Sequence, residues 1–220
     1  MTTSLKARAA TFGAVSIVNA IASGRGATAS VRLTTEAEVE IESSKGDWEV
    51  FVNGERSGSR LALETVRSAI RSAGKEPDSF SGTVRTTSSV PIGAGLKTSS
   101  ASSTAIAIAI FAALGQRAFD PKKVLDCSVE ASLASGASVT GALDDAAGCL
   151  LGGVNMTDNL ARKVVSSKLF DKKLTVVIRV PKTRSRRGAV DPGFIRRFGG
   201  LTDPLFEMSL KGDYWRAMVL

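Results

Sequence analysis

The chain has 220 residues, of which 43% are hydrophobic and 5% aromatic. Its 29 Lys and Arg outnumber its 21 Asp and Glu, so the formal net charge is +8, and histidine is absent. This length and apolar content suffice for a sizeable core, in one large domain or in two that share an interface. The positive charge suits an anionic substrate. Because aromatic side chains that stack on bases are scarce, we expect no nucleic-acid partner.

Two cysteines and one apolar segment bear on where the protein works. Cys127 and Cys149 stand singly in apolar helical patterns, so we expect buried, reduced thiols and a cytoplasmic location. The segment Ala9–Ala22 follows two basic residues as a secretory signal would, but polar residues interrupt it. No segment has the roughly 20 apolar residues of a membrane span, so we expect no membrane partner.

In chain order, the first part of the sequence is typical of a sheet with one helix. Strands are expected near Lys6–Thr11, Ala27–Thr34, Val39–Glu42 and Trp48–Val52. Asn53-Gly54 then predicts a tight turn. Apolar residues at helical spacing predict a helix over Leu61–Ala73, and alternation predicts a strand over Phe80–Ser89.

The second part is richer in helix. Strands are expected near Val154–Thr157 and Leu174–Val180. The expected helices cover Ser102–Leu114, Pro121 to about Ala134, a short segment from near Asp144, Phe194–Phe198 and Leu205–Leu220. Since strands and helices do not alternate as βαβ units, the predicted fold class is α+β.

The most distinctive segment is Pro91-Ile-Gly-Ala-Gly-Leu-Lys-Thr-Ser-Ser-Ala101, which leads into an apolar helix. Glycines let the backbone approach an anion, and the positive end of a helix lies behind them, so we expect ATP as the bound nucleotide. The segment is not the common P-loop, because Leu96 precedes Lys97 where that loop has glycine, nor a Rossmann fingerprint. The expected ATP-binding residues are Pro91, Ile92, Gly93, Ala94, Gly95, Leu96, Lys97, Thr98, Ser99, Ser100 and Ala101.

Three segments together resemble the GHMP kinase superfamily, and within it the archaeal-type shikimate kinases. They are Gly13–Ala20 with Gly24-Arg-Gly26, the loop Pro91–Ser103, and Ser138–Ala146 with Gly152-Gly153. The resemblance covers nearly the whole chain and implies a GHMP kinase fold. Residues 1–153 would form the ATP-binding, ribosomal protein S5 domain 2-like N-terminal part, and residues 154–220 the start of an α/β C-terminal domain. The family's third glycine-rich motif is not found before Leu220, so we expect this C-terminal domain to be truncated.

The resemblance implies an ATP- and Mg²⁺-dependent kinase that phosphorylates the 3-hydroxyl of shikimate, a step in chorismate and aromatic amino-acid synthesis. Asp144 and Asp145 are the candidate catalytic residues, because a carboxylate can orient the hydroxyl and take its proton late in a loose transition state. Asp144 is preferred, although the distance to Gly152-Gly153 fits Asp145 better. Either aspartate could instead cap the helix that follows.

The resemblance also implies a metal site. Ser100 lies where the family places a hydroxyl ligand of Mg²⁺, and Glu130 in the next helix would complete the oxygen coordination. The alternatives are a helix-capping role for Ser100 and a solvent-facing charge for Glu130. Asp126, one turn before Glu130 on the same helix face, is a competing carboxylate.

Shikimate carries a carboxylate, so its pocket should hold a fixed cation, preferably arginine. Arg25 and the cluster Thr183–Arg187 are candidates, with a solvated basic surface as the alternative. Asn19 is either a turn residue or a binding group. The expected substrate-binding residues are Ser16, Asn19, Ala20 and Arg25.

Several relatives carry a lysine directly after the first-motif glycine, where this chain has Ala14 after Gly13. Lys6 or Arg8 on the first strand are the spatial substitutes to consider, with surface charge as the alternative. The competing functions are another GHMP kinase, such as homoserine kinase, and a truncated, non-catalytic nucleotide-binding protein.

Overall fold

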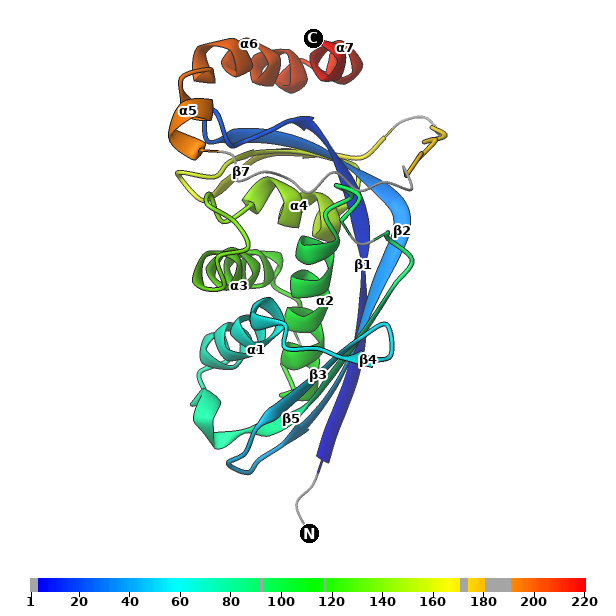
Figure 1. Cartoon of the computed structure of the whole chain (residues 1–220), viewed down its shortest axis with the longest axis vertical. Helices are drawn as coiled ribbons and strands as arrows, with labels where there is room; N and C mark the ends of the chain where they lie inside the picture. The colour runs from blue at the N-terminus through cyan, green and yellow to red at the C-terminus, as the bar shows by residue number, and fades with distance from the viewer. Residues whose placement is uncertain (1–3, 92, 117, 171–173, 181–190) are drawn as a thin grey trace.

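The computed structural model describes residues 4–91, 93–116, 118–170, 174–180 and 191–220. One mixed sheet carries helices on both faces (Figure 1). The strands are β1 (Ser4–Val18), β2 (Arg25–Glu42), β3 (Trp48–Val52), β4 (Glu55–Arg56), β5 (Ser81–Ser88), β6 (Val154–Asp158) and β7 (Lys163–Lys168). The α-helices are α1 (Arg60–Ser72), α2 (Thr98–Ala113), α3 (Pro121–Ala134), α4 (Leu143–Leu151), α5 (Pro192–Arg196), α6 (Gly199–Leu210) and α7 (Tyr214–Val219), and η1 (Pro77–Ser79) is a 3₁₀ turn.

The long strand β2 organises the sheet. Along one edge it pairs antiparallel with β1 from Ser4↔Glu42 to Val18↔Ala27. Its other edge pairs antiparallel with β5 near its C-terminal end and with β6 near its start. The sheet order is β4-β3-β5-β2-β6-β7, and only β3 and β5 run parallel. The two strands predicted at 27–34 and 39–42 are therefore one continuous strand.

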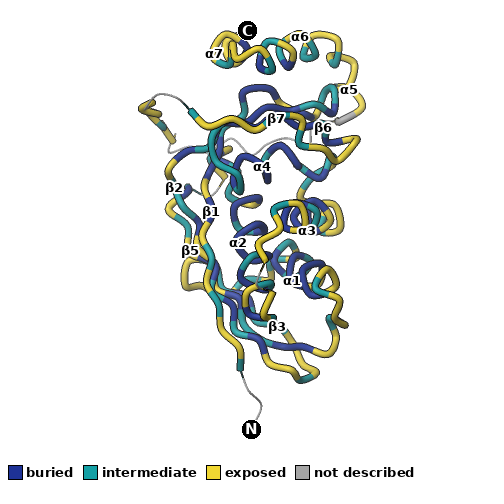
Figure 2. The backbone as a smooth tube through the Cα atoms, turned by 180° about the vertical axis from the view of Figure 1, so that it is seen from behind, coloured by how far each residue is buried: buried dark blue, intermediate teal, exposed yellow. Residues whose placement is uncertain are grey.

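Helix α2 is the centre of the main core. Its residues are mostly Ala, Ile, Ser and Thr, and most of its length is dark blue in Figure 2. A helix without a charged face can be buried on most sides, and α2 packs against β1, β2, α1, α3 and α4. Its small side chains allow these neighbours to approach closely, and its N-terminus lies close to α4.

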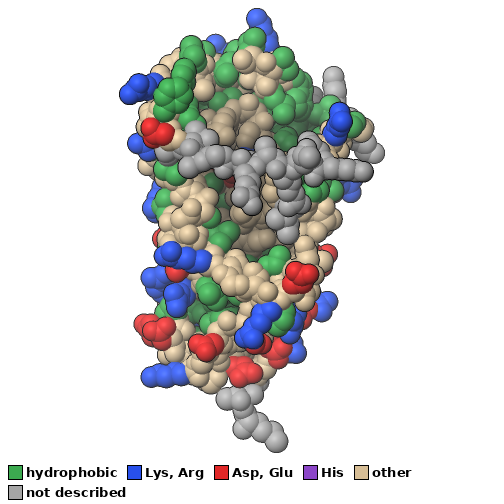
Figure 3. Space-filling model, in the orientation of Figure 1, with side chains coloured by type: hydrophobic (Ala, Val, Ile, Leu, Met, Phe, Trp, Pro, Cys, Tyr) green, Lys and Arg blue, Asp and Glu red, His purple; other side chains and the backbone are tan. Residues whose placement is uncertain are grey.

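A second core lies at the end of the sheet where α4 packs, but on the opposite face. Val154 and Met156 of β6 pack there with Phe206 of α6 and Ala217 of α7. Successive strand residues face opposite sides, so Asn155 and the other alternate residues of β6 face α4. Hydrophobic side chains also gather on the surface at this end of the molecule (Figure 3), and the exposed ones include Phe194, Leu201, Trp215 and Val219.

The α+β class is confirmed, as is the turn at Asn53-Gly54, where both residues have positive φ (52° and 86°). The strand predicted at 174–180 is wrong. These residues have no regular structure, and Val177 is 90% exposed, because β propensity needs a partner strand to form a ladder. Two strands were missed: the two-residue β4, and β7, a mostly exposed edge strand with weak apolar alternation.

The sheet continues across the predicted domain boundary at residue 153, since β6 pairs with β2. The division into two domains stays a prediction. Within the described ranges, none of the helices has the length and apolar content that crossing a membrane requires.

Candidate functional site

The glycine-rich loop reverses the chain just before α2. Gly93 and Gly95 have positive φ (74° and 78°), and Lys97, directly before the helix, also has positive φ (62°). The loop is tied to the first motif, because the Ala14 N–H donates to the Leu96 carbonyl at 3.2 Å. Thr98 closes the loop by donating its hydroxyl to the Pro91 carbonyl at 3.3 Å. The first two sequence motifs are therefore neighbours in space.

The start of α2 is open to an acceptor. Lys97 occupies the N-cap position, and no described side chain caps the first turn. Ser100 lies buried inside that turn, and its carbonyl accepts from the Thr104 hydroxyl at 2.8 Å. The capping alternative for Ser100 is thus not observed. First-turn N–H groups without a capping side chain, at the positive end of a 16-residue helix, favour an anion.

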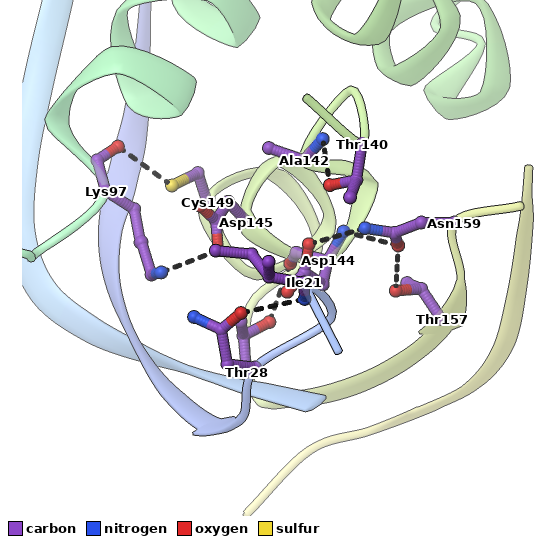
Figure 4. A network of polar contacts seen from close by, with 11 residues as sticks. Ile21, Thr28, Lys97, Thr140, Ala142, Asp144, Asp145, Cys149, Thr157 and Asn159 are labelled. Atoms are coloured by element: carbon purple, nitrogen blue, oxygen red, sulfur yellow. Dashed lines mark hydrogen bonds and ion pairs between the residues drawn. The ribbon is translucent and has the colours of Figure 1, made fainter. Parts of the chain in front are cut away.

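Asp145 lies beside this loop. Its Oδ1 forms an ion pair with Lys97 Nζ at 2.8 Å (Figure 4). Both side chains are mostly buried, with 15% of Lys97 and 21% of Asp145 exposed. The N-cap of α4 is Ala142, and neither aspartate caps the helix. Both instead lie in the first turn, where the helix dipole stabilises negative charge.

Asp144 points into the protein and is 4% exposed. Its Oδ1 accepts from Asn159 Nδ2 at 2.9 Å, and its backbone N–H donates to Asn159 Oδ1 at 3.2 Å. The Thr157 hydroxyl also donates to Asn159 Oδ1, at 2.8 Å. The Thr28 hydroxyl donates to the Asp144 carbonyl at 2.7 Å. Asp144 therefore fastens α4 to β2 and β6, whereas Asp145 faces the loop, so we propose Asp145 in place of Asp144, the aspartate preferred from the sequence.

Asn159, Thr157 and Thr28 were missed by the sequence interpretation. Polar residues in and just after predicted strands carry no signal of which buried partner they meet. The sequence signal that favours Asp145 is its spacing to Gly152-Gly153.

Cys149 forms a further contact between α4 and the loop. Its thiol donates to the Lys97 carbonyl at 3.6 Å. Burial strongly raises the pKa of the Cys149 thiol, with the nearby Asp145 charge as a smaller cause. A thiol held protonated in this way contributes packing and a weak hydrogen bond, not nucleophilic chemistry.

The structure does not bring Glu130 to Ser100. Glu130 Oε2 accepts from the Ser68 hydroxyl of α1 at 2.6 Å, and it lines a cavity of about 250 Å³ between α1 and α3 with Glu64 and Arg71. Two residues earlier, Ser128 hydrogen-bonds Ser103 of α2 at 2.6 Å. Residues two apart point to opposite sides of a helix, so Glu130 faces away from α2. Among the described residues, no group of three or more acidic or Cys side chains forms a metal site.

Of the expected substrate residues, Ser16 lies on the face of the sheet that carries α4, whereas Asn19 and Ala20 belong to the turn after β1. Ser16 pairs across the sheet with Thr28, whose side chain reaches α4, so Ser16 is on the face of the sheet that carries Asp145. Asn19 is exposed, and its Oδ1 accepts from the Ile21 N–H at 2.8 Å, which is a turn contact. Ala20 is buried, and its carbonyl accepts from the Gly24 N–H.

Arg25 contacts α6, which packs in the second core. Its guanidinium pairs with Asp203 at 2.8 Å and with Glu207 at 3.0 Å on α6, and it lies over the Phe206 ring. These carboxylates raise the pKa of Arg25, and the largest cause is the hydrogen bond that Arg25 donates to Asp203. Arg25 thus holds α6 on the sheet.

Lys6 and Arg8 do not replace the missing first-motif lysine. They pair with Glu40 and Glu38 on β2, and 63% and 80% of their side chains are exposed. Among the residues that the structure describes, Lys97 from the second motif is a cation that lies beside Asp145. Ile92 and the basic cluster 183–187 lie outside the described residues.

The sequence is similar to that of known proteins. The GHMP kinases N terminal domain matches residues 60–153. The chain is 35% identical to a shikimate kinase from Methanothrix thermoacetophila over 98% of this chain and 72% of that protein.

Solved structures share the fold. Mevalonate diphosphate decarboxylase from Staphylococcus aureus superposes with a TM-score of 0.63 at 16% identity, over 98% of this chain and 68% of its own. The corresponding enzyme from Enterococcus faecalis gives a TM-score of 0.55 at 18% identity, over 71% of this chain. This chain spans 48% of the length of that structure.

Proposed function

Because the chain belongs to the GHMP kinase family, we propose that it is a shikimate kinase, which transfers the γ-phosphoryl group of ATP to the 3-hydroxyl of shikimate. The products would be 3-phosphoshikimate and ADP, on the route to chorismate and the aromatic amino acids. The observation that carries the proposal is the ion pair between Asp145 and Lys97, which places a carboxylate beside the loop that we propose to bind phosphate. The identity to relatives named shikimate kinase supports the choice of alcohol. The free, buried thiols of Cys127 and Cys149 agree with the cytoplasm as its location.

The loop fits the phosphates of a nucleotide. Gly93 and Gly95 are exposed and have positive φ, so their backbone can approach an anion without a side chain in the way. The N–H groups at the start of α2 have no capping side chain, and Lys97 adds a full positive charge. Together these groups would neutralise and position the phosphates, which is most of what a protein contributes to phosphoryl transfer.

Asp145 is the proposed base. In the reaction, a bond forms between the alcohol oxygen and the γ-phosphorus while the bond from that phosphorus to the ADP oxygen breaks, and its electron pair stays on ADP. The proton of the alcohol passes to the Asp145 carboxylate. Asp144 has the separate role of fixing the first turn of α4, so that Asp145 keeps its place beside the loop.

Magnesium would add charge neutralisation on the phosphates. From this chain, the Ser100 hydroxyl would be the candidate ligand, since Ser100 lies in the first turn of α2 behind the loop. Glu130 does not fit that site, because it faces α1. We therefore assign no step of the mechanism to the ion.

On the substrate side, Ser16 is the retained candidate, since it lies on the same face of the sheet as α4. Asn19 and Ala20 would shape this region through the turn that follows β1. Arg25 is the weaker candidate for the shikimate carboxylate, because its guanidinium already holds Asp203 and Glu207.

The test is Mg²⁺-dependent ADP release from the purified chain with ATP and shikimate, homoserine or mevalonate as the alcohol. We expect release with shikimate alone, and a loss of about 10²- to 10⁴-fold in kcat for Asp145→Asn. Asp144→Asn should lower the thermal midpoint clearly, and its loss of kcat should be smaller than that of Asp145→Asn. Release with homoserine or mevalonate instead would overturn the substrate, and ATP binding without release would identify a non-catalytic nucleotide-binding protein.

A further inference from the structure

Lys97 has a backbone conformation that lysine rarely adopts. Its φ of 62° lies in the left-handed region, where the Cβ of any residue except glycine is crowded. Strained residues of this kind persist where the surrounding structure holds them, and they concentrate at functional sites. A glycine would meet the backbone requirement here, so the lysine side chain itself must be accounted for.

Both ends of Lys97 contact α4. Its ammonium pairs with Asp145 at 2.8 Å, and its carbonyl accepts the Cys149 thiol at 3.6 Å. The same residue is the last of the glycine loop and the N-cap of α2. Lys97 therefore belongs to the expected phosphate site and contacts the expected base, and Figure 4 shows its contacts with Asp145 and Cys149.

The ion pair is sheltered from solvent. With exposed fractions of 15% and 21%, the two charges are screened less by water and salt than a surface pair would be. An anion held by the loop would attract the same ammonium group. Asp145 and such an anion thus compete for one cation.

We infer that Lys97 is a shared cation that couples nucleotide binding to the freedom of Asp145. Without nucleotide, Lys97 neutralises the Asp145 carboxylate and holds it in the ion pair. When phosphates engage Lys97, Asp145 loses part of its counter-charge and becomes a better acceptor for the proton of the alcohol. The base is then strengthened only when the phosphoryl donor is present. This inference rests on the proposed function, because it takes a nucleoside triphosphate as the anion.

Linkage makes the coupling measurable without any turnover. If the phosphates weaken the hold of Lys97 on Asp145, then removing the Asp145 charge must strengthen nucleotide binding to the same degree. The direct repulsion between Asp145 and the phosphates would also disappear in that variant. Of the gain in nucleotide affinity, only the share that comes from releasing Lys97 requires the lysine to be present.

The experiment is calorimetric titration of ATP with Mg²⁺, and no alcohol, into wild type, Asp145→Asn, Lys97→Met and the double variant. We expect Asp145→Asn to bind ATP about 5- to 10-fold more tightly than wild type. Lys97→Met should bind about 10-fold more weakly, because it lacks a charge-assisted phosphate contact. With Lys97→Met as the background, the gain from Asp145→Asn should fall to about 2-fold or less.

The chain offers a matched control pair. Lys6 and Glu40 also form an ion pair, but on β1 and β2 toward the opposite end of the sheet from the loop (Figure 1). Glu40→Gln and Lys6→Met change the net charge by the same amounts as Asp145→Asn and Lys97→Met, and they should leave ATP affinity within about 2-fold of wild type. Lys97→Gly removes the same ammonium without backbone strain, so it checks that weak binding by Lys97→Met does not reflect misfolding.

Each outcome has one meaning. An equal gain from Asp145→Asn with and without Lys97 would overturn the inference, since the effect would then be repulsion alone. Unchanged ATP affinity in Asp145→Asn, in a chain that phosphorylates shikimate, would overturn it while leaving the proposed function in place. Coupling in a chain that is silent with shikimate would support it and overturn the proposed substrate. A wild type that does not bind ATP would overturn both.

Discussion

The Asp144 carboxylate lies directly against the backbone of Gly26. A Cβ built on Gly26 would lie 2.5 Å from Asp144 Oδ2 and 2.8 Å from its Cγ, closer than real side chains approach. Helix α4 can therefore sit this close to β2 only because residue 26 has no side chain. Since Asp145 follows Asp144 in the same turn, this contact also sets where the proposed base lies relative to the loop.

We predict that Gly26→Ala displaces the first turn of α4. The added methyl group must push Asp144 away from β2, which should cost about 1–3 kcal/mol of unfolding free energy and lower kcat by about 10-fold or more as Asp145 shifts. Urea unfolding and steady-state ADP release measure the two effects. Gly58→Ala is the matched control, because a Cβ on Gly58 meets no atom within 4 Å. If Gly26→Ala matches that control in both measurements, the close contact does not position α4.

A second prediction concerns the Asn159 hydrogen bonds. Asn159→Ala leaves the buried Asp144 carboxylate and the Thr157 hydroxyl without this partner. We expect a loss of about 1–3 kcal/mol in unfolding free energy, because an unsatisfied buried polar group bears its full desolvation cost. Asn19→Ala removes an exposed turn contact and should cost less than about 1 kcal/mol. Equal losses in the two variants would contradict a structural role for the Asn159 network.

The elements that the sequence predicted well are those with strong local signals. The helix over 121–134 was predicted with its observed bounds, since Pro121 follows an Asp120 N-cap and apolar spacing continues to Ala134. The glycine-rich loop before α2 was predicted because glycines and a helix start form a local pattern, and its phosphate-binding role stays a prediction. The single strand β2 was divided in two, because its burial against two different sets of neighbours is a property of the whole sheet.

The candidate site was predicted less completely, because its chemistry depends on contacts between distant segments. Lys97 and Asp145 are 48 positions apart in the sequence, and no spacing rule connects them. The adjacent aspartates differ in the direction that each side chain takes from α4, Asp144 into the sheet and Asp145 toward the loop, and no local pattern predicts this difference. Glu130 had a helical position that suited a metal ligand, but the Ser103–Ser128 contact shows that another face of α3 meets α2.

A third prediction concerns pH and the start of β1. The Ser4 hydroxyl donates to Glu40 at 2.8 Å, and Lys6 pairs with the same carboxylate; these contacts lower the pKa of Glu40 below its usual 4.5. A carboxyl group whose pKa is lower in the folded state adds stability above its unfolded pKa, and this contribution is lost as the pH falls through the folded value. Wild type should therefore exceed Glu40→Gln in thermal midpoint at pH 7, and the difference should shrink below pH 4.5.

Ser4→Ala separates the two causes of this shift. It removes the hydroxyl, which is the largest cause, but keeps the charge of Glu40 and its pairing with Lys6. We expect its thermal midpoint to depend on pH less than that of wild type. A difference between wild type and Glu40→Gln that is constant from pH 7 to pH 3 would show that Glu40 acts through packing and not through its ionised form.

The last prediction measures the strain at Lys97. Lys97→Ala and Lys97→Gly both remove the ion pair with Asp145, and they differ only in the Cβ, which is crowded at a φ of 62°. Lys97→Gly should therefore be more stable than Lys97→Ala by about 1 kcal/mol in chemical denaturation. Ala142, with a φ of 52° at the start of α4, provides a positive control, since Ala142→Gly should gain a similar amount over wild type. If glycine and alanine at position 97 give equal stability while Ala142→Gly gains, then Lys97 is not strained, and its side chain needs no functional reason to be there.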